Sequence, residues 1–134
     1  MKVAGMQRMQ RALAAVKQAE MNALGAELQR SLEARREASR LRDEARQQAS
    51  ATSIAEMAAQ SAFQAHLEAR ARTAEARAEE AEDRANKMRA TLAKTLGRET
   101  VTERLINQAN AERRANAEKR QEDLLAASTA AIDA

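Results

Sequence analysis

Side chains that could carry out chemistry are few and scattered. The chain has one histidine, His66, and no cysteine, so a catalytic triad, a thiol nucleophile or a histidine-based metal site would lack its other members. Carboxylates are plentiful at residues 79–83. A run of acids on one straight helix does not form the concave oxygen cage that a cation needs. The sequence therefore predicts no enzyme activity, no cofactor and no metal site.

Two other stretches resemble ligand-binding motifs only in part. Residues 97–100, Gly-Arg-Glu-Thr, lack the spacing and the lysine of a phosphate-binding loop. Six arginines between residues 30 and 46 could neutralise phosphates, but four acidic residues are interleaved at helical ion-pairing distances. No aromatic side chain is nearby to stack on bases. We expect this stretch to flank a coiled coil or to dock a protein. Nucleic-acid binding is a third, less favoured alternative, and no small-molecule substrate is expected.

The elements that must position these residues are helices. The 134 residues include no proline and three glycines, and strong helix formers dominate throughout. Large apolar side chains are too sparse for an ordinary globular core, because their burial would not offset the entropy of ordering the chain. Apolar residues instead recur at heptad spacing, which is typical of a coiled coil. The longest series is Leu67, Ala71, Ala74, Ala78, Ala81, Ala85, Met88 and Leu92.

The first part of the chain shows the same spacing. Its two series are Met6, Met9, Leu13 and Val16, and then Ala34, Ala38, Leu41, Ala45 and Ala49. Residues 50–53 predict a turn, with Ser53 as the N-cap of the next helix and Glu56 as its capping-box partner. Thr52 is an alternative N-cap, and a weaker break is predicted at 97–100. We therefore expect one coiled-coil unit over residues 1–134, with helices at about 3–49 and 54–127.

A fold-back at the turn predicts an all-α, antiparallel two-helix hairpin. If the chain reverses near residue 51 or 52, the numbers of facing residues sum to about 103. This register matches large side chains with small ones, as native packing density favours. The pairs are Leu24 with Ala78, Leu28 with Ala74, and Leu32 with Ala71.

In this register the second helix overhangs from about residue 105 to residue 127. Leu105 and Ile106 are its first apolar anchors, and Arg113 and Arg114 give it a basic flank. An amphipathic helix of this kind can dock into a groove on another protein. We expect these four residues to bind a partner, and the alternative is a frayed helix without a role.

Phe63 is the only aromatic residue, and it begins a helical stripe with Leu67, Arg70 and Ala74. Leu67 and Ala74 already belong to the heptad series, so a core position is the first interpretation of the stripe. Contact with a partner is the second interpretation. The four residues are therefore candidate partner-binding residues as well.

The layout of the chain resembles the FliJ and YscO family of flagellar and type III secretion stalk proteins. It does so in the opening MQRMQRALAAVKQAEMNALGAELQ, in the polar turn before Phe63 and Leu67, and in the later GRETVTERLINQANAERRANAEKRQE. The resemblance implies a stalk in the pore of a hexameric export ATPase ring, which contacts the export gate and couples hydrolysis to export. It also implies that Phe63, Leu67, Arg70 and Ala74 match the gate-facing stretch.

The expected function is that of a non-enzymatic stalk or adaptor, with the export ATPase ring and the export gate as partners. The alternative is a structural, homo-oligomeric coiled-coil scaffold or spacer without a motor role. The opening residues lack the apolar core of a secretory signal, and no stretch is apolar enough to span a membrane. We therefore expect a cytoplasmic protein that reaches the inner membrane only peripherally, through the export apparatus.

Overall fold

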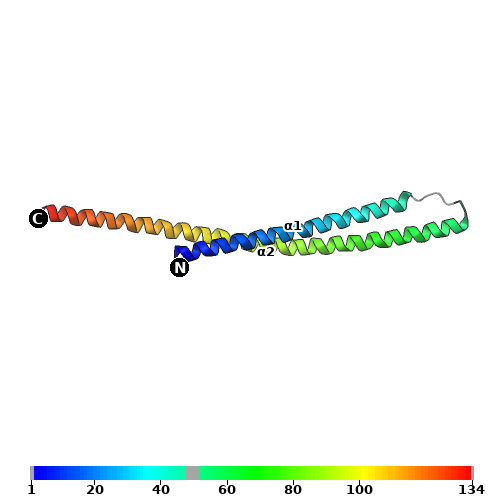
Figure 1. The fold of residues 1–134 in the computed structure, drawn as a ribbon, viewed down its shortest axis with the longest axis horizontal. Coiled ribbons are helices and arrows are strands. Elements are labelled where there is room, and N and C mark those ends of the chain that lie inside the picture. Colours follow the sequence, from blue (N-terminus) through cyan, green and yellow to red (C-terminus); the bar gives the residue numbers. More distant parts are fainter. Residues whose placement is uncertain (1, 48–51, 134) are drawn as a thin grey trace. The chain divides into compact units, whose positions relative to one another are not determined.

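The computed structural model describes residues 2–47 and 52–133, which form two α-helices. Helix α1 spans Val3–Gln47 and helix α2 spans Ile54–Asp133, and the described residues include no strand. The two helices run in opposite directions and pack against each other (Figure 1). The predicted all-α, antiparallel two-helix hairpin is therefore confirmed. Helix α2 continues to Asp133 rather than ending near residue 127, and the predicted turn lies partly outside the described residues.

A capping box begins α2. The hydroxyl of Ser53 accepts a hydrogen bond from the backbone N–H of Glu56 at 3.1 Å, so the predicted N-cap is confirmed. The carboxylate of Glu56 turns back to Thr52, accepting bonds from its hydroxyl at 2.7 Å and from its backbone N–H at 2.9 Å. These bonds, chiefly the one from the Thr52 hydroxyl, hold the pKa of Glu56 below its ordinary value. The predicted break at 97–100 is wrong, because α2 runs through it without interruption.

The chain divides into two compact units, each built from both helices. The central unit comprises residues 19–92, and the terminal unit comprises the described residues 2–18 and 93–133. The core of the central unit is a cluster of Ala38, Leu41, Leu67, Ala71 and Ala74, with Ala45 packed against it. Leu41 and Leu67 are its largest fully buried side chains.

The heptad series predicted on α2 is confirmed. Leu67, Ala71 and the four alanines that follow at heptad spacing are buried, and Met88 and Leu92 are half-buried. Matching the core cluster in antiparallel order pairs Ala38 with Ala74, Leu41 with Ala71, and Ala45 with Leu67. The numbers in each pair sum to 112. Each leucine thus meets an alanine, which is the large–small alternation expected from the sequence.

The predicted register is nevertheless wrong by about nine residues. Leu28 and Leu32 are 38% and 43% exposed. The predicted register, in which the numbers of facing residues sum to 103, would bury them against alanines. Glu27 and Ser31 are buried at the seam positions beside them. The observed register buries Leu41 and Leu67 and pairs charges across the helices, as described below. Alanine layers alone do not select one register, because alanine fits opposite almost any neighbour.

In the terminal unit the seam contains many polar residues. Gln10 and Lys17 are half-buried on α1, and Thr95 and Thr102 are buried on α2. Lys17 Nζ lies 2.9 Å from Glu99 Oε1 across the two helices. Met9 and Val16, which were expected in the seam, are exposed, because the observed heptad passes through Gln10 and Lys17 instead.

The pairing of α2 with α1 extends further than predicted. Ile106 is only 8% exposed, whereas the overhang was expected to begin at about residue 105. The register explains the difference, because a sum of 112 places Ile106 opposite Met6, near the beginning of α1. Every residue from 111 to 133 is exposed. The overhang is therefore real but begins after Asn110, along the orange and red part of α2 in Figure 1.

Candidate protein-binding surfaces

A buried carboxylate in the α1 seam organises the first group of cross-helix contacts. Glu27 Oε2 accepts a hydrogen bond from Arg84 Nε at 3.1 Å, and Glu27 Oε1 accepts one from Arg30 Nη1 at 2.6 Å. The side chain of Glu27 is 6% exposed, while both arginines reach solvent. Two guanidinium groups therefore compensate a charge that occupies a position where a heptad usually places an apolar residue.

The next contact along the hairpin joins Arg35 and Ser31 to Glu82. Glu82 Oε1 accepts hydrogen bonds from Arg35 Nε at 2.8 Å and from the Ser31 hydroxyl at 3.1 Å. The bond from Arg35 is the main reason that the pKa of Glu82 lies below its ordinary value. Glu82 belongs to the acidic run at 79–83. In the part of the chain that the structure describes, no three His, Asp or Glu side chains gather to hold a metal ion.

Arg42 forms the third contact, with two carboxylates on α2. It forms ion pairs with Glu75 and, at 3.3 Å, with Glu68. Its hydrogen bonds lower the pKa of both carboxyl groups, and in turn raise the pKa of the guanidinium. Ion pairs that reach from α1 to α2 therefore recur along the central unit, and they help to set its register.

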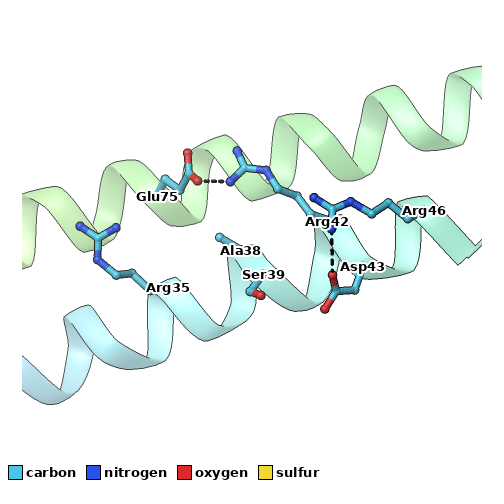
Figure 2. Close-up of a pocket in the computed structure, with 7 residues that line it drawn as sticks. All are labelled: Arg35, Ala38, Ser39, Arg42, Asp43, Arg46 and Glu75. Atoms are coloured by element: carbon cyan, nitrogen blue, oxygen red, sulfur yellow. Dashed lines mark hydrogen bonds and ion pairs between the residues drawn. The ribbon is translucent and has the colours of Figure 1, made fainter.

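A hollow of about 210 Å³ lies beside Arg42 (Figure 2). Its floor is formed by Ala38 and Ser39, and the guanidinium groups of Arg42 and Arg46 lie at its rim. Arg46 forms an ion pair with Asp43 at 3.6 Å. Acidic side chains of the chain itself already compensate these arginines, so the hollow lacks the excess positive charge of an anion site. The predicted flanking role of this arginine-rich stretch fits the structure.

The stripe that begins at Phe63 is divided between the core and the surface. Leu67 and Ala74 are buried in the core cluster. Phe63 is exposed, and Arg70 is exposed with Nη2 3.9 Å from Glu37 Oε1. Leu67 and Ala74 therefore cannot reach a partner while the helices are packed. Partner contact at Phe63 and Arg70 stays a prediction.

The candidates on the overhang are divided in the same way. Ile106 packs in the seam of the terminal unit, whereas Leu105, Arg113 and Arg114 are exposed. Ile106 is therefore corrected to a core residue. A role for the other three in partner binding stays a prediction.

Leu105 borders an apolar groove in the terminal unit, here called the terminal groove. It encloses about 610 Å³ between the beginning of α1 and the facing part of α2. Met9, Val101 and Leu105 are its exposed apolar side chains. The lining residues are Met9, Leu13, Lys94, Gly97, Arg98, Val101, Thr102 and Leu105.

The terminal groove was not predicted from the sequence, because Met9 was expected in the seam. The signal that could have found it is the pair Gln10 and Lys17, which continue the heptad of the later α1 series back toward residue 3. Gly97 contributes open space, since no atom lies within 4 Å of the position where a Cβ would stand. The groove is therefore a consequence of the register rather than of a local motif.

A second apolar surface lies at the end of α2, here called the C-terminal segment (residues 122–133). Leu124, Leu125 and Ile132 are 70%, 67% and 81% exposed, the highest values among the large apolar side chains of α2 after Ile54. No charged residue lies between residues 124 and 132, while Glu122, Asp123 and Asp133 flank the stretch. The segment thus combines apolar anchors with negative charge at both ends.

Comparison with known proteins adds nothing to the assignment of these surfaces. No family model matches the chain, and no curated protein or solved structure matches it. Within the described residues, neither helix has a stretch long and apolar enough to cross a membrane.

Proposed function

We propose that this protein is a non-enzymatic coiled-coil adaptor that presents the unpaired end of α2 to a partner protein. The observation that carries the proposal is α2 beyond Asn110, which stays helical to Asp133 with every described side chain exposed. A helix without tertiary contacts is only marginally stable in water. Such a helix gains most when it docks its apolar residues into a groove or ring lumen.

The partner we propose is the ATPase ring of a flagellar or type III export apparatus, in line with the resemblance in layout. In this function α2 would enter the ring, and the exposed Phe63 and Arg70 would contact the export gate. Arg113 and Arg114 would mainly steer the encounter, because exposed charges affect association rates more than residence times. Leu124 and Leu125 would act as the anchors. The protein would work in the cytoplasm, peripheral to the inner membrane through that apparatus.

The test is capture of the export ATPase by the purified chain. The substitutions Leu124→Asp and Leu125→Asp together should abolish capture and leave the helix content of the hairpin unchanged. The matched control is Ala126→Asp with Ala130→Asp, which adds the same charge to the opposite face of the same exposed segment and should retain capture. Changing Ile106 would be uninformative, because that side chain is buried in the seam. Equal capture by both double variants would overturn the proposal.

A structural homo-oligomeric scaffold is the second candidate, favoured by one observation on the central unit. Met21, Leu28 and Leu32 are exposed on α1, at the seven- and four-residue spacing of one helix face. A second copy could cover this face. If it does, a chain truncated after Asn110 should still form oligomers, and Leu28→Asp should make it monomeric.

A further inference from the structure

We infer that the C-terminal segment of one copy docks into the terminal groove of a second copy, so that chains associate head to tail. The inference concerns the chain alone and does not depend on the ATPase. It joins the two apolar surfaces of the terminal unit, each of which lacks an occupant within the described residues.

The two surfaces match in size and in apolar character. The groove extends along α2 from Lys94 to Leu105, which is about 16 Å of helix. The apolar stretch from Leu124 to Ile132 is about 12 Å long. The exposed side chains of Met9, Val101 and Leu105 offer apolar contact, and the missing side chain of Gly97 leaves space for a leucine.

The two surfaces also carry opposite charges. Lys94 and Arg98 line the groove, and neither forms an ion pair within the described part of the chain. Glu122, Asp123 and Asp133 flank the apolar stretch of the segment. Because carboxylates stand at both of its ends, either direction of docking brings negative charge to the two cations.

The occupant must come from another molecule. Leu124 follows Val101 by 23 residues on the uninterrupted helix α2, which is about 35 Å along its axis. A continuous helix cannot fold back over that distance onto its own groove. The segment of the same chain is therefore excluded, and a second copy supplies it.

Helix geometry also excludes a closed dimer in which two segments fill two grooves at once. At about 100° per residue, Leu124, Leu125 and Ile132 point roughly 120–140° away from Val101 around the α2 axis. In a two-fold symmetric antiparallel pair the same face of both helices would have to form the contact. A heterologous contact remains, and such a contact continues from copy to copy.

The experiment is sedimentation of the intact chain over a series of concentrations. The contact is small, so we expect association only at high concentrations, up to about 1 mM. The weight-average mass should then rise beyond that of a dimer. Val101→Asp in the groove, and separately Leu124→Asp with Leu125→Asp in the segment, should each give monomers. The matched controls are Ala93→Asp, and separately Ala126→Asp with Ala130→Asp on the face of the segment opposite Leu124, Leu125 and Ile132. Both should associate as the unaltered chain does.

Mixing a groove variant with a segment variant tests the head-to-tail contact most directly. A chain with a disabled groove and a chain with a disabled segment can form only one contact, so their equimolar mixture should stop at a dimer. Charge reversal gives an independent readout. Lys94→Glu with Arg98→Glu should weaken association at least tenfold, and adding Glu122→Lys, Asp123→Lys and Asp133→Lys in the same chain should restore it.

Three results would overturn the inference. The unaltered chain could stay monomeric throughout the series, its mass could stop at two copies, or Val101→Asp could associate normally. Circular dichroism would verify that each variant keeps its helix content. The ATPase proposal is tested separately, because Val101→Asp should lose self-association and still capture the ATPase.

Discussion

Arg84 Nε lies 3.1 Å from Glu27 Oε2, and it connects α2 to a carboxylate that is almost completely buried in the α1 seam. The two partners differ in exposure, since the side chain of Arg84 is 48% exposed. Arginine without its partner can be hydrated, whereas a buried carboxylate without its partner remains desolvated. Removing Arg84 should therefore lower the free energy of unfolding more than removing Glu27.

This asymmetry predicts unequal effects of removing the two side chains. Arg84→Ala should lower the free energy of unfolding by about 1–3 kcal/mol, because Glu27 would keep only Arg30. Glu27→Leu should be neutral or stabilising, since an apolar side chain suits the seam and both arginines can turn to water. Urea unfolding followed by circular dichroism measures both effects. A larger loss for Glu27→Leu than for Arg84→Ala would contradict the explanation.

The register predicts which engineered disulfides can form. Ala38→Cys with Ala74→Cys should cross-link rapidly in air, because both residues lie in one core cluster and pair in the observed register. Leu32→Cys with Ala71→Cys, which a register of 103 would bring together, should stay reduced. The natural chain has no cysteine, so gel mobility without reductant reports each pair directly. Efficient cross-linking of the second pair would show that the helices slide.

The core cluster predicts where a truncation of leucine matters most. Leu41 is 1% exposed, and Leu41→Ala should cost about 2–4 kcal/mol because it leaves a cavity among alanines. Leu32→Ala is the matched control on the same helix, and its exposed side chain should cost no more than about 0.5 kcal/mol. Thermal unfolding compares the two. Similar losses would mean that the cluster is not the main core.

The cross-helix ion pairs predict a loss of stability in acid. Arg42 and Arg35 hold the pKa values of Glu68, Glu75 and Glu82 below the ordinary value of 4.5. A depressed pKa in the folded state contributes stability above the ordinary value, and this contribution is lost as the pH falls through the folded values. The Tm should therefore be flat near neutral pH and fall below about pH 4.5.

A triple variant provides the control for this pH dependence. Glu68→Gln, Glu75→Gln and Glu82→Gln together keep the shape of the side chains but remove their titration. The variant should have a lower Tm at neutral pH and a shallower fall in acid. Parallel curves for the variant and the unaltered chain would show that other carboxylates cause the effect.

The overhang predicts that the end of the chain is dispensable for folding. Truncation after Asn110 should leave the Tm unchanged, because the described residues beyond it are all exposed. Amide hydrogens over residues 111–133 should exchange much faster than those around Leu41 and Leu67, since an isolated helix opens readily. A lower Tm for the truncated chain would show that the segment contributes to the fold.

Sequence alone determined the helices, the heptad on α2 and the N-cap at Ser53. Each of these depends on local physics: helix propensity, a repeat of 3.5 residues and a hydroxyl beside unpaired N–H groups. The hairpin could also be predicted from the sequence, because one polar turn separates two long segments that are rich in strong helix formers. These features need no knowledge of which residue on α1 meets which residue on α2.

The tertiary structure decided the register, and with it the surfaces. Alanine is small enough to fit many alignments of the two helices, so the apolar pattern did not distinguish a sum of 103 from a sum of 112. Polar partners distinguished them, because burying Glu27 is tolerable only where Arg84 can reach it. The observed register exposes Met9 beside Val101, buries Ile106 and leaves residues 111–133 exposed. Pairing between residues distant in sequence therefore fixed what local patterns could not.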